Sequence, residues 1–122
     1  LGREFRFPVS EENQRLIERI LDRADAFHGR VASREQVQIQ LEFPCHRQWL
    51  DLFLGWWREG FRRWRERAAE GDRLIFTTEL GPPRWYAISG PDGDEMSDRW
   101  EEALLLRREV RAVWDELAAV PV

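Results

Sequence analysis

Residues 74–86 read LIFTTELGPPRWY, an apolar run that leads to an acid and then to a proline-rich turn. The run Leu74–Phe76 is typical of a buried strand, whereas Gly81 and the two prolines after it favour a rigid turn. Glu79 stands between them, at the point where the strand is expected to end. A carboxylate at that point indicates either a residue with a chemical role or a cap for the turn that follows.

Apolar periodicity divides the chain into alternating helices and strands. Helical repeats are expected over about 10–24, 46–70 and 98–117, and short apolar strands over 26–31 and 73–78. Strands that alternate with helices usually lie parallel and are joined by crossover helices. The sequence therefore predicts an α/β fold with three helices and two parallel neighbouring strands, linked by the helix of about 46–70.

Capping residues mark the ends of the expected helices. Ser10, followed by two acids, is a typical N-cap for the first helix. Asp98 with Glu101 three residues later resembles a capping pair for the last helix. Gly71 is the natural stop for the middle helix.

The same periodicity predicts which helical side chains are buried. The apolar face of the first helix comprises Leu16, Ile17, Ile20, Leu21 and Ala24. In the last helix we expect Trp100, Leu104 and Trp114 to be buried and Arg108, Arg111 and Glu116 to be exposed.

The composition allows one modest domain, over residues 1–122, and favours no charged polymer as a partner. The 122 residues are 43% hydrophobic, which suffices for a single core. All 19 basic residues are arginine, and 23 acids leave a formal net charge of −4, so general binding to nucleic acid or membrane is not expected. No stretch approaches the roughly 20 apolar residues of a membrane helix. A single cysteine, Cys45, fits a reducing compartment, and the cytoplasm is the default expectation.

Two further patterns have both a functional and a structural interpretation. Arginines interspersed with Trp56, Trp57 and Trp64 are compatible with a stacking surface for nucleic acid. Glutamates intersperse the same arginines, so a solvated face over a buried aromatic stripe is the favoured interpretation. Cys45 beside His46 resembles a nucleophile pair, although adjacent residues generally point apart.

Polar side chains follow both expected strands at their carboxyl ends, where the sites of parallel α/β proteins collect. His28 and Glu79 occupy these positions, and an imidazole and a carboxylate on neighbouring strands could share a divalent metal. Arg30 lies two residues beyond His28 and should project to the same side, toward an oxygen-rich substrate. Two ligands are too few for a tight metal site, and a hydrogen-bonded structural histidine is the alternative.

Four stretches together resemble a known enzyme family. They are AFHGRVASREQVQ at 26–38, WLDLFLGWWREGFRRWRERAAEG at 49–71, LIFTTELGPPRWYAI at 74–88 and SDRWEEALLLRREVRAVW at 97–114. This series resembles the C-terminal part of the sugar phosphate isomerase/epimerase family, within the xylose-isomerase-like superfamily of (β/α)8 TIM barrels. The most specific element is Glu-Leu-Gly-Pro-Pro at 79–83 together with the aromatic pair Trp85–Tyr86.

The resemblance implies a role for each strand-end residue. His28 and Glu79 look like metal ligands at the ends of the seventh and eighth barrel strands, and Arg30 like a substrate contact. Glu79 would also carry the proton. Enzymes of this family bind a divalent ion such as Mn, Mg, Co or Zn, which polarises the oxygens of a sugar or sugar phosphate while a proton moves between neighbouring carbons through an ene-diolate.

The chain departs from the family in its length. A complete barrel needs about 250 residues, so the earlier strands that should supply another Glu and an Asp ligand are absent, and residues 1–9 match no expected element. We therefore expect the last third to half of a barrel, a piece of something longer that binds metal weakly alone. It would be active only with its missing N-terminal half or a partner chain. The alternative is a non-catalytic interaction module, or one subunit of a split barrel, that retains the fold.

Overall fold

The computed structural model describes residues 10–81, 91–92, 94 and 96–119 of the chain. Its elements follow in the order α1 (Glu11–Leu21), β1 (Ala26–Gly29), the short 3-10 helix η1 (Pro44–His46), α2 (Arg47–Arg67), β2 (Ile75–Thr78) and α4 (Arg99–Ala119). The expected alternation of three α-helices with two strands is confirmed, and the fold is mixed α/β.

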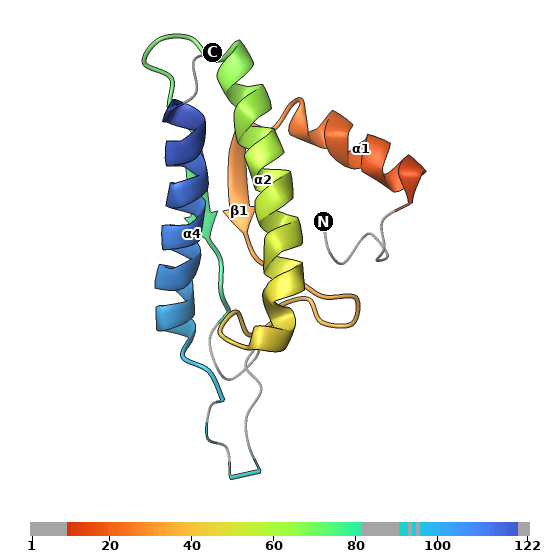
Figure 1. Cartoon of the computed structure of the whole chain (residues 1–122), viewed down its shortest axis with the longest axis vertical. Helices are drawn as coiled ribbons and strands as arrows, with labels where there is room; N and C mark the ends of the chain where they lie inside the picture. Colours follow the sequence, from red (N-terminus) through yellow and green to blue (C-terminus); the bar gives the residue numbers. More distant parts are fainter. Residues whose placement is uncertain (1–9, 82–90, 93, 95, 120–122) are drawn as a thin grey trace.

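The two strands form a parallel pair, as predicted. Ala26 lies opposite Ile75, and His28 lies opposite Thr77. Both strands run toward the lower end of the molecule in Figure 1, which is also the end where α2 and α4 begin. The carboxyl ends of the strands and the N-termini of two long helices therefore lie at the same end of the molecule.

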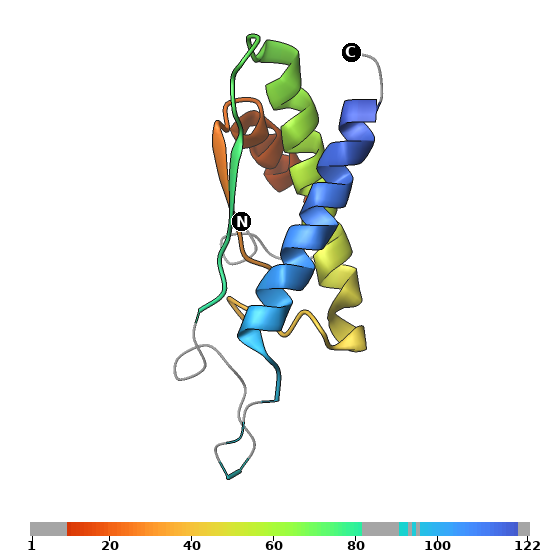
Figure 2. The ribbon, with the colours of Figure 1, turned by 90° about the vertical axis from the view of Figure 1, so that its left-hand side faces the viewer.

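The helices cover only one face of this sheet. Figure 2 shows α2 and α4 together on one side of both strands, and Figure 1 shows α1 beside α2, on the side away from α4. Phe27 and Gly29 of β1 face the helices and are buried, whereas Ala26 and His28 face the other way and are exposed. The same alternation in β2 leaves Ile75 64% exposed. Among the described residues the second face of the sheet is open.

The core is formed by the apolar stripe of α2 against the inner face of the strands. The stripe comprises Leu50, Phe53, Leu54, Trp56, Trp57, Gly60, Phe61 and Trp64. Phe61 meets the Phe27 ring edge-on at 5.3 Å, and Trp57 meets Phe76 edge-on at 4.9 Å. Gly60 allows this close approach, because a Cβ there would lie 2.6 Å from the ring of Phe27. The tryptophans of α2 are therefore core residues, as the structural interpretation predicted.

The predicted helix caps are present at the N-termini and differ at one C-terminus. The Ser10 hydroxyl accepts a hydrogen bond from the Asn13 N–H at 3.2 Å, and Asp98 accepts from the N–H of Trp100 at 2.9 Å and from that of Glu101 at 3.1 Å. The middle helix ends at Arg67, four residues before the expected Gly71. Gly71 instead takes a positive φ of 87° in the turn that leads toward β2, a conformation that favours glycine.

Two expectations about buried helical faces were wrong in part. Trp100 is 71% exposed, because the inward positions in the first turn of α4 are taken by Arg99 and Glu102. In α1 only Ile17 and Leu21 are fully buried. Leu16 and Ile20, at 43% and 42% exposed, lie at the margin of that face.

The remaining predictions for α4 are confirmed for the exposed residues and only in part for the buried ones. Arg108, Arg111 and Glu116 are exposed as expected, whereas Leu104 and Trp114 are half-buried. Leu106 and Val110 are the fully buried apolar residues of this helix. The helix thus lies against the core, rotated relative to the face that the tryptophans suggested.

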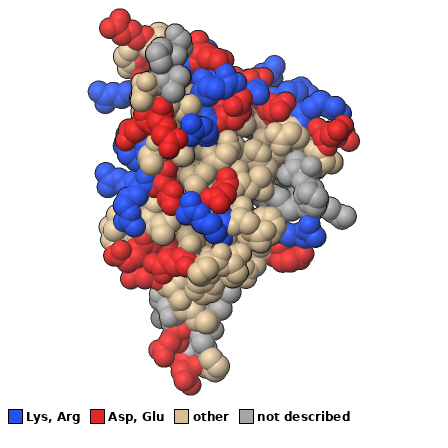
Figure 3. Space-filling model, in the orientation of Figure 1, with Lys and Arg blue, Asp and Glu red and all other residues tan. Residues whose placement is uncertain are grey.

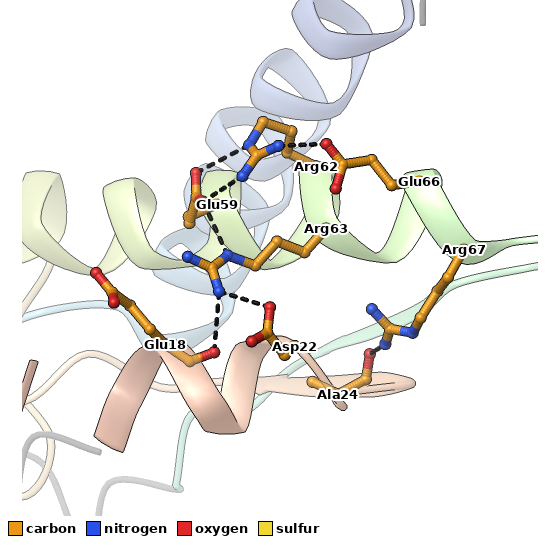
Figure 4. Close-up of polar contacts among 8 residues, drawn as sticks. All are labelled: Glu18, Asp22, Ala24, Glu59, Arg62, Arg63, Glu66 and Arg67. Atoms are coloured by element: carbon orange, nitrogen blue, oxygen red, sulfur yellow. Dashed lines mark hydrogen bonds and ion pairs between the residues drawn. The ribbon is translucent and has the colours of Figure 1, made fainter. Parts of the chain in front are cut away.

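Arginines of α2 hold α1 in place, as Figure 4 shows. The Arg63 guanidinium donates to the Asp22 carboxylate at 2.5 Å and to the backbone carbonyl of Glu18 at 3.2 Å. It also donates to Glu59 within α2 at 2.8 Å. The hydrogen bonds that Arg62 and Arg63 donate to Glu59 lower the pKa of this carboxyl from 4.5 to about 2, because they stabilise its charged form.

Charges of both signs are mixed over the helical face of the molecule. Figure 3 shows acidic and basic side chains interspersed over this face, with apolar surface between them. The mixture agrees with the solvated-face interpretation of the arginines in α2. Within the described residues, no helix has the length and apolar character that crossing a membrane requires.

Candidate functional site

The three residues expected at the strand ends come together on the open face of the sheet. His28 Nδ1 donates a hydrogen bond to Glu79 Oε2 at 3.1 Å, and an Arg30 guanidinium nitrogen lies 3.3 Å from Glu79 Oε1. His28 and Glu79 are 51 positions apart in the sequence. They meet because the parallel register places the end of β1 beside the end of β2.

Strand geometry determines the direction of each of these side chains. Successive residues of a strand point to opposite faces, so His28 and Arg30 share one face of β1, and Thr77 and Glu79 continue the same face of β2. The Glu79 N–H donates to the carbonyl of Gly29 at 2.9 Å, which extends the parallel ladder beyond the strand. The backbone of Glu79 is thus held against β1.

A buried amide fixes the segment that follows Glu79. The side chain of Gln38 accepts from the Gly81 N–H at 2.7 Å and donates to the Gly81 carbonyl at 3.4 Å. Gln38 is only 5% exposed and belongs to the loop that follows β1. The loops after both strands are therefore tied together directly beneath the site.

A second buried polar group connects the loop after β1 to the start of α4. The Glu102 carboxylate accepts a hydrogen bond from the Leu41 N–H and lies 3.4 Å from the Arg99 guanidinium. Arg99 also donates to the carbonyl of Ile39 at 3.2 Å. Glu102 is fully buried and Arg99 nearly so, and a buried carboxylate of this kind requires such partners. The contacts hold the loop against α4 at the same end of the molecule.

Sequence reasoning found His28, Arg30 and Glu79 and missed the residues that support them. Gln38 lies in a polar loop without periodicity, and its burial depends on contacts with Gly81, 43 positions away. Arg99 and Glu102 carry one weak signal, the spacing of opposite charges by three residues on a helix. That spacing is normally found on exposed faces, so it did not indicate burial.

His28 and Glu79 lie side by side, but their contact is a hydrogen bond and does not have the geometry of two metal ligands. A divalent ion bound by both would displace this hydrogen bond or use the ring nitrogen of His28 that carries no proton. Within the described part of the chain, no group of three or more His, Cys, Asp or Glu side chains is placed to hold an ion. The described residues therefore offer two candidate ligands, fewer than a divalent ion requires.

The electrostatics of the pair are set by Arg30 and by exposure to solvent. Arg30 places a positive charge beside the same carboxylate that would bind a cation, and so competes with it. The His28 side chain is 73% exposed and that of Glu79 is 41% exposed. Because Nδ1 of His28 donates to Glu79, the other ring nitrogen is the one that remains to bind an ion.

His46 makes a hydrogen bond to the backbone instead of pairing with Cys45. His46 Nδ1 donates to the backbone carbonyl of Gln40 at 2.7 Å, and its ring stacks on Phe43 with centroids 5.6 Å apart. Cys45 is exposed at the surface. The histidine ring is thus oriented by the loop after β1.

Two parts of the expected site lie outside the described residues. They are Pro82–Pro83, which should stiffen the loop after Glu79, and the aromatic pair Trp85–Tyr86, on which the resemblance partly rests. At this end of the sheet the structure describes the ends of both strands, the cluster of His28, Arg30 and Glu79, and the hydrogen bonds between Gln38 and Gly81.

Comparisons with known proteins identify no family for this arrangement: no family model, no curated protein and no solved structure matches the chain.

Proposed function

We propose that the chain is the C-terminal part of a metal-dependent sugar or sugar phosphate isomerase/epimerase, and that His28, Arg30 and Glu79 are its share of the active site. The observation that carries the proposal is the contact among these three side chains at the carboxyl ends of two parallel strands. Ligands of parallel α/β proteins bind at that end of the strands. The mixed α/β architecture is compatible with the last two strands of a TIM barrel.

Each residue has a role that follows from its chemistry. His28 and Glu79 would hold a divalent cation such as Mn²⁺, Mg²⁺, Co²⁺ or Zn²⁺, whose chemistry is to polarise carbonyl and hydroxyl oxygens of the substrate. Glu79 takes a proton from one carbon of the substrate and returns it to the neighbouring carbon. Arg30, half-buried beside Glu79, donates to hydroxyl or phosphate oxygens of the sugar.

The site requires further ligands from a second source. Divalent cations with oxygen and nitrogen ligands usually have about six ligands, several of them water, and the described part of this chain offers two. The missing N-terminal half of the barrel or a partner chain would bring the others to the open face of the sheet. The proposal includes neither nucleic acid nor membrane as a partner and places the reaction in the cytoplasm.

Titration with Mn²⁺, followed by the loss of the electron paramagnetic resonance signal of the free ion, tests the proposal on the chain itself. The expected dissociation constant is on the order of 1 mM, because only two protein ligands take part. His28→Ala and Glu79→Gln should each weaken binding about tenfold or more. Arg30→Gln should strengthen binding, because it removes the positive charge beside the carboxylate.

Glu70→Gln is the matched control, since it removes an exposed carboxylate outside this cluster. It should leave the Mn²⁺ affinity unchanged. Equal affinities for the wild type, His28→Ala and Glu79→Gln would exclude both side chains as ligands and overturn the proposal.

The second candidate is a non-catalytic interaction module that retains the fold. It is favoured by the fact that Glu79 already has two partners, His28 and Arg30, so the cluster could serve only to join the ends of the strands. In that case Glu79→Gln would lower the free energy of unfolding and change no metal affinity. The same titration, combined with urea unfolding, separates the two functions.

A further inference from the structure

A groove with a mixed apolar and polar lining runs between helix α4 and the edge of β2 that has no partner strand among the described residues. Its volume is about 370 Å³, and its apolar lining includes Phe61, Phe76, Val110 and Trp114. Two arginines of α4, Arg107 and Arg111, and Thr78 of β2 also line it. The groove lies on the helical side of the sheet, whereas His28 and Glu79 lie on the open side. The inference therefore concerns a different surface from the proposed metal site. In a complete barrel this edge of β2 would pair with a strand of the missing half, so the two proposals assign the edge different occupants.

The edge of β2 presents unpaired backbone groups beside this groove. Among the described residues, β2 pairs only with β1. The Glu79 N–H donates to Gly29 in β1, and successive peptide groups of a strand point to opposite edges. The N–H and C=O groups of Phe76 and Thr78 therefore point away from β1, and both residues line the groove. Such an edge is a template for another strand.

The arginines beside the groove differ in their ion pairs from arginines of α2 such as Arg47 and Arg58. On the side of α4 that faces α2, Glu109 binds Arg47 at 2.8 Å and Glu116 binds Arg58 at 2.6 Å. Within the part of the chain that the structure describes, no carboxylate forms an ion pair with Arg107 or Arg111.

These arginines also line a second hollow on α4, of about 390 Å³, together with Arg108 and Asp115. One acid among three arginines leaves this side of α4 positively charged. A complementary surface would be acidic.

We propose that the β2 edge and the groove bind an extended segment of another polypeptide, whose side chains on the α4 side are apolar and acidic. The segment continues the sheet through hydrogen bonds to Phe76 and Thr78. Its apolar side chains fill the groove, and its carboxylates pair with Arg107 and Arg111. A second copy of this chain fits poorly, because a two-fold contact at this edge would bring the same arginines together.

Fluorescence anisotropy with labelled peptides tests the proposal. The probe is a peptide of about nine residues that repeats Thr-Val-Thr-Glu, so that one face is neutral and the other alternates Val with Glu. A matched peptide carries Lys in place of Glu. The Glu peptide should bind at least about tenfold more tightly than the Lys peptide, and the double variant Arg107→Glu/Arg111→Glu should reverse the preference.

Two variants of Thr78 examine the strand edge itself. Thr78→Pro removes the outward N–H without affecting the pairing with β1, and it should abolish binding of the Glu peptide. Thr78→Val keeps the N–H and the branched shape, and it should bind as the wild type does. Circular dichroism melting of each variant shows whether the fold is retained. If Thr78→Pro does not fold, the peptide preference of the Arg107→Glu/Arg111→Glu variant alone decides whether the proposal holds.

Three results would overturn the proposal. They are equal affinity for the Glu and Lys peptides, full binding by a folded Thr78→Pro variant, and self-association of the wild type that Thr78→Pro abolishes in sedimentation experiments. The last result would identify a second copy of the chain as the occupant of the groove.

Discussion

At the scale of the residue, two glycines of α2 with different surroundings give opposite predictions. A Cβ at Gly60 would lie 2.6 Å from the ring of Phe27 and 3.0 Å from Leu21, both buried. Gly60→Ala should therefore lower the free energy of unfolding by about 1–3 kcal/mol, because the core must shift to admit the methyl group.

Gly55→Ala on the same helix is the control. Nothing lies within 4 Å of a Cβ at that position, and alanine is a better helix former than glycine. It should raise the free energy of unfolding by about 0.5–1 kcal/mol. Urea unfolding measures both changes, and equal effects of the two substitutions would contradict the packing described for Gly60.

The candidate site could be predicted at this scale because strand geometry determines it. Alternation along a strand places His28 with Arg30, and parallel pairing brings Glu79 beside them. The supporting residues could not be predicted in the same way. Burial of Gln38 and Glu102 arises from loops that pack against distant segments, and no local pattern in the sequence records such contacts.

At the scale of the element, the existence of each helix was predictable and the rotation of α4 was not. The apolar stripe of α2 has one clear face, so its burial follows from periodicity. In α4 the apolar residues Leu104, Leu105 and Leu106 are consecutive and occupy several faces. The rotation is decided instead by Arg99 and Glu102, which bind the loop after β1.

The two tryptophans of α4 provide a test of this rotation. Trp114 packs against Phe61 and Trp64 at centroid distances of 5.8 and 6.0 Å, and the Arg65 guanidinium lies over its ring at 5.6 Å. Trp114→Ala should lower the free energy of unfolding by about 2–3 kcal/mol, somewhat less than for a fully buried tryptophan. The exposed Trp100 is the control, and Trp100→Ala should change stability by less than about 0.5 kcal/mol. A larger effect at Trp100 in thermal or urea unfolding would show that α4 is rotated the other way.

At the scale of the whole molecule, the protonation of Glu59 makes the stability of the packing between α1 and α2 depend on pH. Its pKa falls from 4.5 to about 2 in the folded chain, chiefly through hydrogen bonds from Arg62 and Arg63. A group with a lowered folded pKa contributes stability that is complete above the unfolded value and is lost as the pH falls. The stability of the wild type should therefore decline between about pH 4.5 and pH 2.

Glu59→Gln isolates this contribution. Glu59 is more than a third exposed, so solvent screening limits the effect to about 1 kcal/mol or less. The variant should be less stable than the wild type at pH 6, and the two should approach one another near pH 2. Free energies from urea unfolding across this range measure the difference, and a constant difference at every pH would contradict the assignment.

The parallel pairing of strands that are far apart in the sequence also governs how the molecule folds. His28 and Glu79 are separated by 51 positions, so their contact closes a long loop, and such non-local contacts slow folding. A sheet of two short strands is marginal by itself. Any ligand that bridges His28 and Glu79 in the folded chain would therefore stabilise the strand pair, and the melting temperature should rise with the logarithm of the ligand concentration once this exceeds the dissociation constant.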